Sequence, residues 1–257
     1  MLTPDLDLAR EFVASNPPPG RLVLCAVSGA HMYGFPSADS DLDLKGIHLV
    51  PTRELLGLRP DVAVHDLTAF HRGVECDLTT NEAGSALSLL LNGNGNMLER
   101  ILSPFQLTQT DEVLELQELA RRSVSRSFVR HYAGFFRGCQ REHEREATAK
   151  TMLYSYRVAL TGVHLLRSRL LEPNLSVLAP TFGYHDVADL VALKQAGTEH
   201  GPLPDDLDQY HRGRWPELEQ ALVDAEAESS LPAEAPNVAE IEAWLISTRL
   251  TAFTSSS

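Results

Sequence analysis

Residues 28–46 read SGAHMYGFPSADSDLDLKG and lie between two apolar segments. The valine-rich run LVLCAV at 22–27 stops at Ser28-Gly29, and DLDLKGIHLV at 41–50 alternates polar with apolar residues. Both patterns predict β-strands. Small residues in the intervening turn let backbone N–H groups approach a phosphate closely. A helix starting there would add the favourable partial charge of its N-terminus. The stretch therefore predicts a strand, a phosphate-binding turn and a second strand.

Two aspartates open the second of these strands. Side chains alternate along a strand, so Asp41 and Asp43 share one face. Two neighbouring carboxylates repel each other unless a cation lies between them, and Mg²⁺ is bound by carboxylate and phosphate oxygens. A phosphate-binding turn beside paired carboxylates indicates metal-assisted phosphoryl or nucleotidyl transfer. The alternative interpretation is a set of solvated turn and edge residues, because an isolated Asp-x-Asp is a weak motif.

The remaining patterns place strands early in the chain and helices later. An amphipathic helix at 5–14 is ended by NPPPG at 16–20, because prolines cannot occupy a helix interior. Further strands are expected at 62–67 and 74–79, and helical patterns begin at Glu82. Residues 111–172 look mostly helical, with a break expected around Gly134–Gly138. Later helices are expected at 187–194, 216–228 and 237–252. We predict an α+β protein, with a mixed α/β domain at 1–110 and a helical domain at 111–257.

The deciding stretch resembles a known family. Gly29-Ala30, ten further residues and Asp41-Leu42-Asp43-Leu44 resemble the signature of the DNA polymerase β nucleotidyltransferase superfamily. The longer pattern Gly-x-x-x-Tyr-Gly … Ser-Asp-x-Asp-x-Lys/Arg-Gly is similar to its RlaP-type branch, an RNA-repair-pathway group. The residues that meet it are Gly29, Tyr33, Gly34, Ser40, Asp41, Asp43, Lys45 and Gly46. Residues 74–102 resemble the strand and two helices that follow in that branch, with Gly95 in place of a turn proline.

The resemblance implies a third carboxylate on a neighbouring strand. Asp77 falls at that place, and Glu75, on the same strand face, is the alternative. Together with Asp41 and Asp43 it would hold Mg²⁺ or Mn²⁺ as the catalytic metal site. Ser28, Gly29 and Ser40 would contact the nucleoside triphosphate. Ala30 stands where the family usually has a hydroxyl residue.

A polar stripe is expected on the helix at 150–164, at spacings of four and three residues. It comprises Lys150, Tyr154, Arg157, Thr161 and His164. Lys150 and Arg157 could stabilise charge on the leaving pyrophosphate. The alternative is the solvated face of an amphipathic helix.

Charge is distributed unevenly along the chain. The formal net charge is −13, which disfavours polyanions on average. Residues 121–150, however, contain eight Lys or Arg against three Glu, and aromatic residues alternate with the arginines of 121–145. In such a segment the arginines can bind phosphates and the aromatic rings can stack on bases. The alternative is that the aromatic residues belong to the core and the arginines lie on the surface. RNA contact is expected in this segment.

Several classes are disfavoured. The most apolar stretch, at 86–91, is far shorter than the roughly 20 residues that span a bilayer. The N-terminus is acidic where a signal peptide is basic, so we expect a soluble cytoplasmic protein without membrane contact. Three cysteines without CxxC spacing disfavour a disulfide or zinc framework.

The expected function is Mg²⁺-dependent transfer of a nucleoside monophosphate from an NTP to an acceptor hydroxyl. From the resemblance, the acceptor is an RNA end in a repair setting. One alternative is nucleotidylation of a protein or small molecule. Another is a catalytically silent module that binds RNA or a partner, which Ala30 favours.

Overall fold

The computed structural model describes residues 3–56, 64–197 and 201–255. Its contacts divide the chain into two compact units. The described parts of Thr3–Gly29, Asp41–Ser123 and Ala235–Ser257 form the first, here called the sheet unit. Ala30–Ser40 and the described part of Val124–Glu234 belong to the second, the helical unit. The two functional domains expected at 1–110 and 111–257 stay a prediction.

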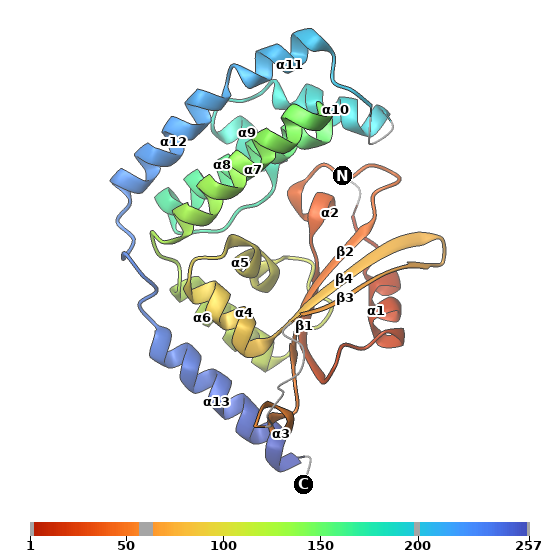
Figure 1. Cartoon of the computed structure of the whole chain (residues 1–257), viewed down its shortest axis with the longest axis vertical. Coiled ribbons are helices and arrows are strands. Elements are labelled where there is room, and N and C mark those ends of the chain that lie inside the picture. Colours follow the sequence, from red (N-terminus) through yellow and green to blue (C-terminus); the bar gives the residue numbers. More distant parts are fainter. Residues whose placement is uncertain (1–2, 57–63, 198–200, 256–257) are drawn as a thin grey trace. The chain divides into compact units, whose positions relative to one another are not determined.

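A four-stranded mixed sheet forms the centre of the sheet unit (Figure 1). Its strands are β1 (Arg21–Val27), β2 (Leu42–Leu49), β3 (Val64–His71) and β4 (Val74–Glu82), in the order β1-β2-β4-β3. β2 pairs antiparallel with β1 and parallel with β4, and β3 and β4 form an antiparallel hairpin. The predicted α+β fold and its early strands are confirmed. Positions 62–63 of the expected third strand lie outside the described residues.

One face of the sheet is covered by α1 (Leu6–Ser15). Asp5 caps this helix by accepting from the backbone N–H groups of Asp7 and Leu8. The core beneath it includes Phe12 of α1, Leu42 and Leu44 of β2, and Cys76 and Leu78 of β4. Since strand side chains alternate, Asp43 and Asp77 must lie on the opposite face.

The other helices of the sheet unit pack on the sheet or on one another. They are α3 (Thr52–Leu55), α4 (Ala83–Leu91), α5 (Gly95–Leu102), α6 (Asp111–Arg122) and α13 (Val238–Ser255). From α5, Arg100 donates to Gly46 O at 2.7 Å and to Asn81 Oδ1 at 2.6 Å. Burial lowers the pKa of this guanidinium to about 10. From α13, Arg249 pairs with Glu82 at 2.7 Å, which ties the last helix to the end of β4.

The helical unit is built around two long helices, α7 (Phe128–Glu146) and α8 (Ala149–Ser168). Shorter helices complete it: α9 (Leu175–Thr181), α10 (Val187–Ala196), α11 (Asp205–Arg212) and α12 (Trp215–Glu228). The expected break at Gly134–Gly138 is wrong, because α7 continues through both glycines. Its buried face, formed by Phe128, Tyr132 and Phe136 among others, outweighs a glycine cost of about 1 kcal/mol each.

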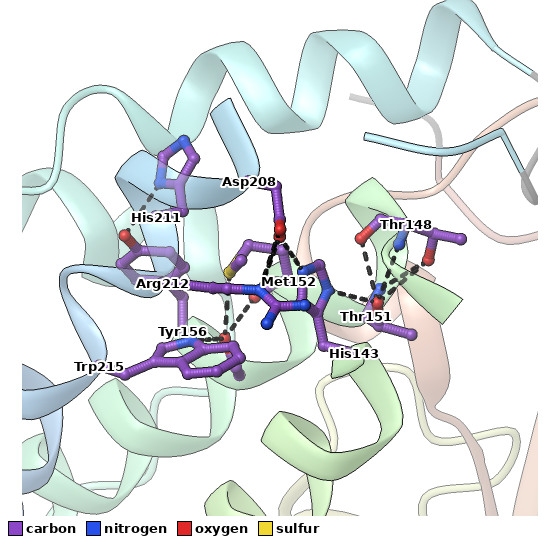
Figure 2. Close-up of polar contacts among 10 residues, drawn as sticks. His143, Thr148, Thr151, Met152, Tyr156, Asp208, His211, Arg212 and Trp215 are labelled. Carbon is purple, nitrogen blue, oxygen red and sulfur yellow. Dashed lines mark hydrogen bonds and ion pairs between the residues drawn. The ribbon is translucent and has the colours of Figure 1, made fainter. Parts of the chain in front are cut away.

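A buried polar network joins α7, α8 and α11 (Figure 2). His143 lies between Thr151 Oγ1, 2.7 Å from Nδ1, and Asp208 Oδ1, 2.6 Å from Nε2. Burial by itself raises the pKa of Asp208, but hydrogen bonds from His143 and Arg212 outweigh it and leave the pKa lowered. Thr151 also takes part in the capping box with Thr148 at the start of α8. The two contacts of His143 fasten α7 to α8 and to α11, so the network stabilises the fold.

None of the described helices combines the length and the apolar composition that a membrane crossing requires.

Candidate active site

The sheet brings two of the expected carboxylates together. Asp43 of β2 and Asp77 of β4 are direct partners in the parallel register, so both side chains project from the same face. Lys45, two residues along β2, lies over them. Its Nζ is 2.8 Å from Asp77 Oδ2 and 3.6 Å from Asp43 Oδ1. Thr68 of β3 donates to Asp77 Oδ1 at 3.2 Å.

The glycine turn faces this pair. Gly29 has φ +60°, and a Cβ added to it would overlap the Asp43 carboxylate. The backbone N–H of Ser28 donates to Asp43 O at 2.8 Å. The turn is therefore built directly against the carboxylate strand, and only glycine leaves room for the Asp43 side chain there.

Asp41 lies just before β2 and is half-buried. The next residue, Leu42, is the register partner of Cys76 in β4, so Asp41 lies near that strand. In the part of the chain that the structure describes, no group of three or more His, Cys, Asp or Glu side chains is arranged to hold a metal ion. The role of Asp41 as a metal ligand stays a prediction.

Asp43 and Asp77 fit a divalent cation in donor type and in charge. Mg²⁺ is commonly bound by one or two carboxylates together with waters and substrate phosphates. An ammonium group already lies against both carboxylates, which shows that a cation is accommodated there. Their side chains are 24% and 35% exposed, so solvent and a ligand can reach them.

At two further positions of the motif, local packing explains why the residue is glycine. A Cβ on Gly46 would lie 2.8 Å from Leu24 O and 3.0 Å from Thr80 Cγ2, because β1 and β4 flank β2 closely. Gly34 has φ +87°, and its Cβ would overlap the Asn174 side chain. Its carbonyl accepts from Ser176 Oγ at 2.9 Å. These positions are explained by packing rather than by contact with a ligand.

The other expected nucleotide-binding residues lie in the helical unit. Ser40 Oγ accepts from the backbone N–H of Ser37 at 2.9 Å, so it holds a turn. Arg157 is 1% exposed, and its guanidinium lies 3.8 Å from the centre of the Tyr33 ring. Lys150 is half-buried in the first turn of α8. The expected polar stripe is thus not a solvated face, since Arg157 and Thr161 are both buried. Their contact with a triphosphate stays a prediction.

Lys45 and Thr68 contact the carboxylates and were missed as site residues by sequence reasoning. Lys45 is part of the motif, and strand alternation alone already puts it on the face of Asp43. Its approach to Asp77 depends on the register between β2 and β4, which lie more than 30 residues apart. For Thr68 the sequence carries no signal beyond its place in a hairpin strand.

A mixed sheet carrying paired carboxylates against a glycine turn defines the class of polymerase-β-like nucleotidyltransferases. The sequence model of the RNA repair pathway DNA polymerase beta family matches residues 8–247, and the chain belongs to this family.

Comparison with other known proteins adds little to this assignment. No curated protein matches the chain. Seven chains of solved structures match, one of them a nucleotidyltransferase-like protein from Exiguobacterium sibiricum 255-15. It is 12% identical, with a TM-score of 0.34, over 97% of this chain and 77% of the other.

Proposed function

We propose that this protein transfers a nucleoside monophosphate from an NTP to an acceptor hydroxyl, and that the acceptor is an RNA end. The observation that carries the proposal is the pairing of Asp43 with Asp77 against the Gly29 turn. Membership of a family linked to RNA repair supports RNA as the acceptor.

In this proposal Asp43 and Asp77 would hold Mg²⁺ or Mn²⁺, with Asp41 as a further carboxylate. A bound cation would neutralise charge on the triphosphate and would activate the attacking hydroxyl. The acceptor oxygen forms a bond to the α-phosphorus, the bond from the α-phosphorus to the bridging oxygen breaks, and pyrophosphate leaves. Asp77 accepts the proton of the hydroxyl. Backbone groups at Ser28 and Gly29 bind the triphosphate.

The proposed RNA contact lies on α7. Arg130, Arg137, Arg141 and Arg145 are all exposed. At 100° and 1.5 Å per residue they lie within an arc of about 80° over a length of about 22 Å. Of the aromatic residues between them, Tyr132 and Phe136 are buried and belong to the core. The arginine stripe thus supports phosphate binding, and these two buried rings are not accessible for stacking on bases.

Label transfer from nucleotides tests the proposal. The full chain is incubated with Mg²⁺ and each of the four α-labelled NTPs, together with RNA, with protein, or without an acceptor. We expect label on RNA. Label on protein would instead support nucleotidylation of a protein, and absence of transfer to every acceptor would support a silent binding module.

A second candidate function is a catalytically silent module that binds RNA or a partner, and Ala30 favours it. This residue lies in the first turn of α2 (Gly29–Tyr33) and offers no hydroxyl to a phosphate. Replacing Ala30 with serine distinguishes an active nucleotidyltransferase from a silent module. An active enzyme should gain nucleotide affinity in Ala30→Ser, whereas a module that binds no nucleotide should be unchanged.

A further inference from the structure

The side chain of Lys45 ends against both candidate metal ligands. Besides its contacts with Asp77 and Asp43, its Nζ donates to Thr79 Oγ1 at 3.2 Å. Lys45 and Thr79 are partners in the register of β2 and β4, two positions further along than Asp43 and Asp77. The ammonium therefore reaches back along the strand to the carboxylates.

The contact with Lys45 reduces the repulsion between the two carboxylates. Two carboxylates on directly paired positions repel each other, and a nearby positive charge removes that repulsion. A divalent cation would do the same from the same side chains. The ammonium and the cation carry like charges, so both cannot lie against the carboxylates without repelling each other.

We propose that Lys45 is an internal counter-ion, which holds Asp43 and Asp77 together while no divalent cation is bound and competes with the cation for them. The inference rests on the proposed function, because it takes the carboxylate pair as the metal site. Lys45 is 22% exposed, and its flexible stem can move the ammonium into solvent without a change in the backbone. It acts as a positioning residue.

Removing the charge of Lys45 should lower the stability of the cation-free protein and raise its affinity for Mn²⁺. Lys45→Met should lower the thermal midpoint of the cation-free protein, because it removes the positive charge that lies against both carboxylates. It should also tighten the binding of free Mn²⁺ by about five-fold, the change expected for one partly exposed charge pair at the strong end of its range. Lys45→Arg, which keeps the charge, should restore both values toward those of the wild type.

The test measures Mn²⁺ binding to the full chain without nucleotide, by the rise of the thermal midpoint and by equilibrium dialysis. Arg21→Met is the matched control. Arg21 pairs with both oxygens of Glu112 at 2.6 and 2.7 Å in the same unit, so this variant also removes one paired cation. It should leave Mn²⁺ affinity unchanged. Lys45→Gln provides a polar variant if Lys45→Met does not fold.

The outcomes separate this inference from the function on which it rests. If Asp43→Asn binds Mn²⁺ as well as the wild type, the proposed metal site itself is wrong. If Asp43→Asn loses binding while Lys45→Met and Lys45→Gln bind Mn²⁺ no more tightly than the wild type, the site stands and the competition by Lys45 is overturned.

Discussion

At the scale of single residues, Gly29 links the turn to the carboxylate pair. It combines φ +60° with a Cβ position that the Asp43 carboxylate already occupies. The sequence motif identified this glycine correctly as part of the site. It could not show that Asp43 is the group in contact, because that contact joins positions 14 residues apart across a turn of unknown conformation.

We predict that Gly29→Ala displaces the Asp43 side chain. The left-handed backbone conformation alone costs an alanine roughly 1–2 kcal/mol, and the collision adds to it. The rate of nucleotide transfer should fall by far more than the loss of folded protein can explain. The measurements are the free energy of unfolding in urea and the rate of label transfer.

Gly73→Ala is the control for backbone strain. Gly73 has φ +84° in the turn between β3 and β4, and a Cβ there would meet nothing within 4 Å. It should lose stability without losing transfer activity. Equal loss of activity in both variants would contradict a specific contact between Gly29 and Asp43.

At the scale of elements, periodicity predicted most helices and strands, and the errors have local causes. α7 was expected to break at Gly134–Gly138 and does not, because tertiary packing of its apolar face overrides glycine propensity. α9 and α11 lie in segments rich in Pro, Gly and His, where the sequence gives no clear period. The cap of α9, in which Asn174 accepts from the N–H of Ser176, is a short signal that a search for long patterns overlooks.

The continuity of α7 makes a prediction about stability. A Cβ on Gly134 would meet nothing within 4 Å, so Gly134→Ala should stabilise the protein by about 0.5–1 kcal/mol through lower entropy of the unfolded chain. Gly162 of α8 is the matched control, for which the same substitution should have the opposite effect on stability. Its Cβ would lie 2.7 Å from Tyr132 Cβ and 2.8 Å from Leu222 Cδ2, so Gly162→Ala should destabilise. Urea unfolding of both variants checks the pair, and destabilisation by Gly134→Ala would contradict the described course of α7.

The arginine stripe of α7 predicts a change in salt dependence. For single strands the slope of log K against log salt is about −0.7 per neutralised phosphate. Replacing both Arg137 and Arg141 with alanine should therefore weaken RNA binding for all sequences and reduce the slope by roughly 1.4. The measurement is a binding titration at several salt concentrations.

Two arginines of the same charged segment serve as the control. Arg121 and Arg122 are ion-paired with acidic residues, Arg122 with Glu240 at 2.6 Å. Their double replacement with alanine should change the slope little. If this control lowered the slope as much as the α7 variant, RNA binding would not be specific to the stripe.

At the scale of the whole molecule, the fold class follows from the sequence, but the grouping of segments does not. Residues 30–40 belong to the helical unit, and α13 belongs to the sheet unit. Both facts depend on contacts between segments far apart in the chain, such as Asn237 Nδ2 donating to Leu119 O at 2.9 Å. Local periodicity and capping signals carry no information on such partners.

The buried histidines of the helical unit predict how stability depends on pH. His211 is 1% exposed, and its Nδ1 lies 2.9 Å from Tyr156 Oη. Burial lowers its pKa below the ordinary 6.5, so it stays neutral when folded and takes up a proton on unfolding in mild acid. Stability should therefore fall as the pH drops below about 6.5, with a slope of at most about 1.4 kcal/mol per pH unit for this group.

His211→Gln should reduce this slope without removing it, because burial also lowers the pKa of His164. Urea unfolding between pH 5 and 8 measures both proteins. An unchanged slope in the variant would show that His211 does not take up a proton on unfolding.

The central claim is that Asp43 and Asp77 form the metal site of a nucleotidyltransferase. Its most direct test is the initial rate of label transfer from α-labelled NTP to RNA in Mg²⁺ by the wild type, Asp43→Asn, Asp77→Asn and Glu11→Gln. Glu11 is the control carboxylate, since it lies on α1, which covers the other face of the sheet. We predict that the two aspartate variants lose about 100-fold or more, because even the outer partners of a metal site cost 10–100-fold, and that Glu11→Gln retains the wild-type rate. Transfer at the wild-type rate by either folded aspartate variant would contradict the account.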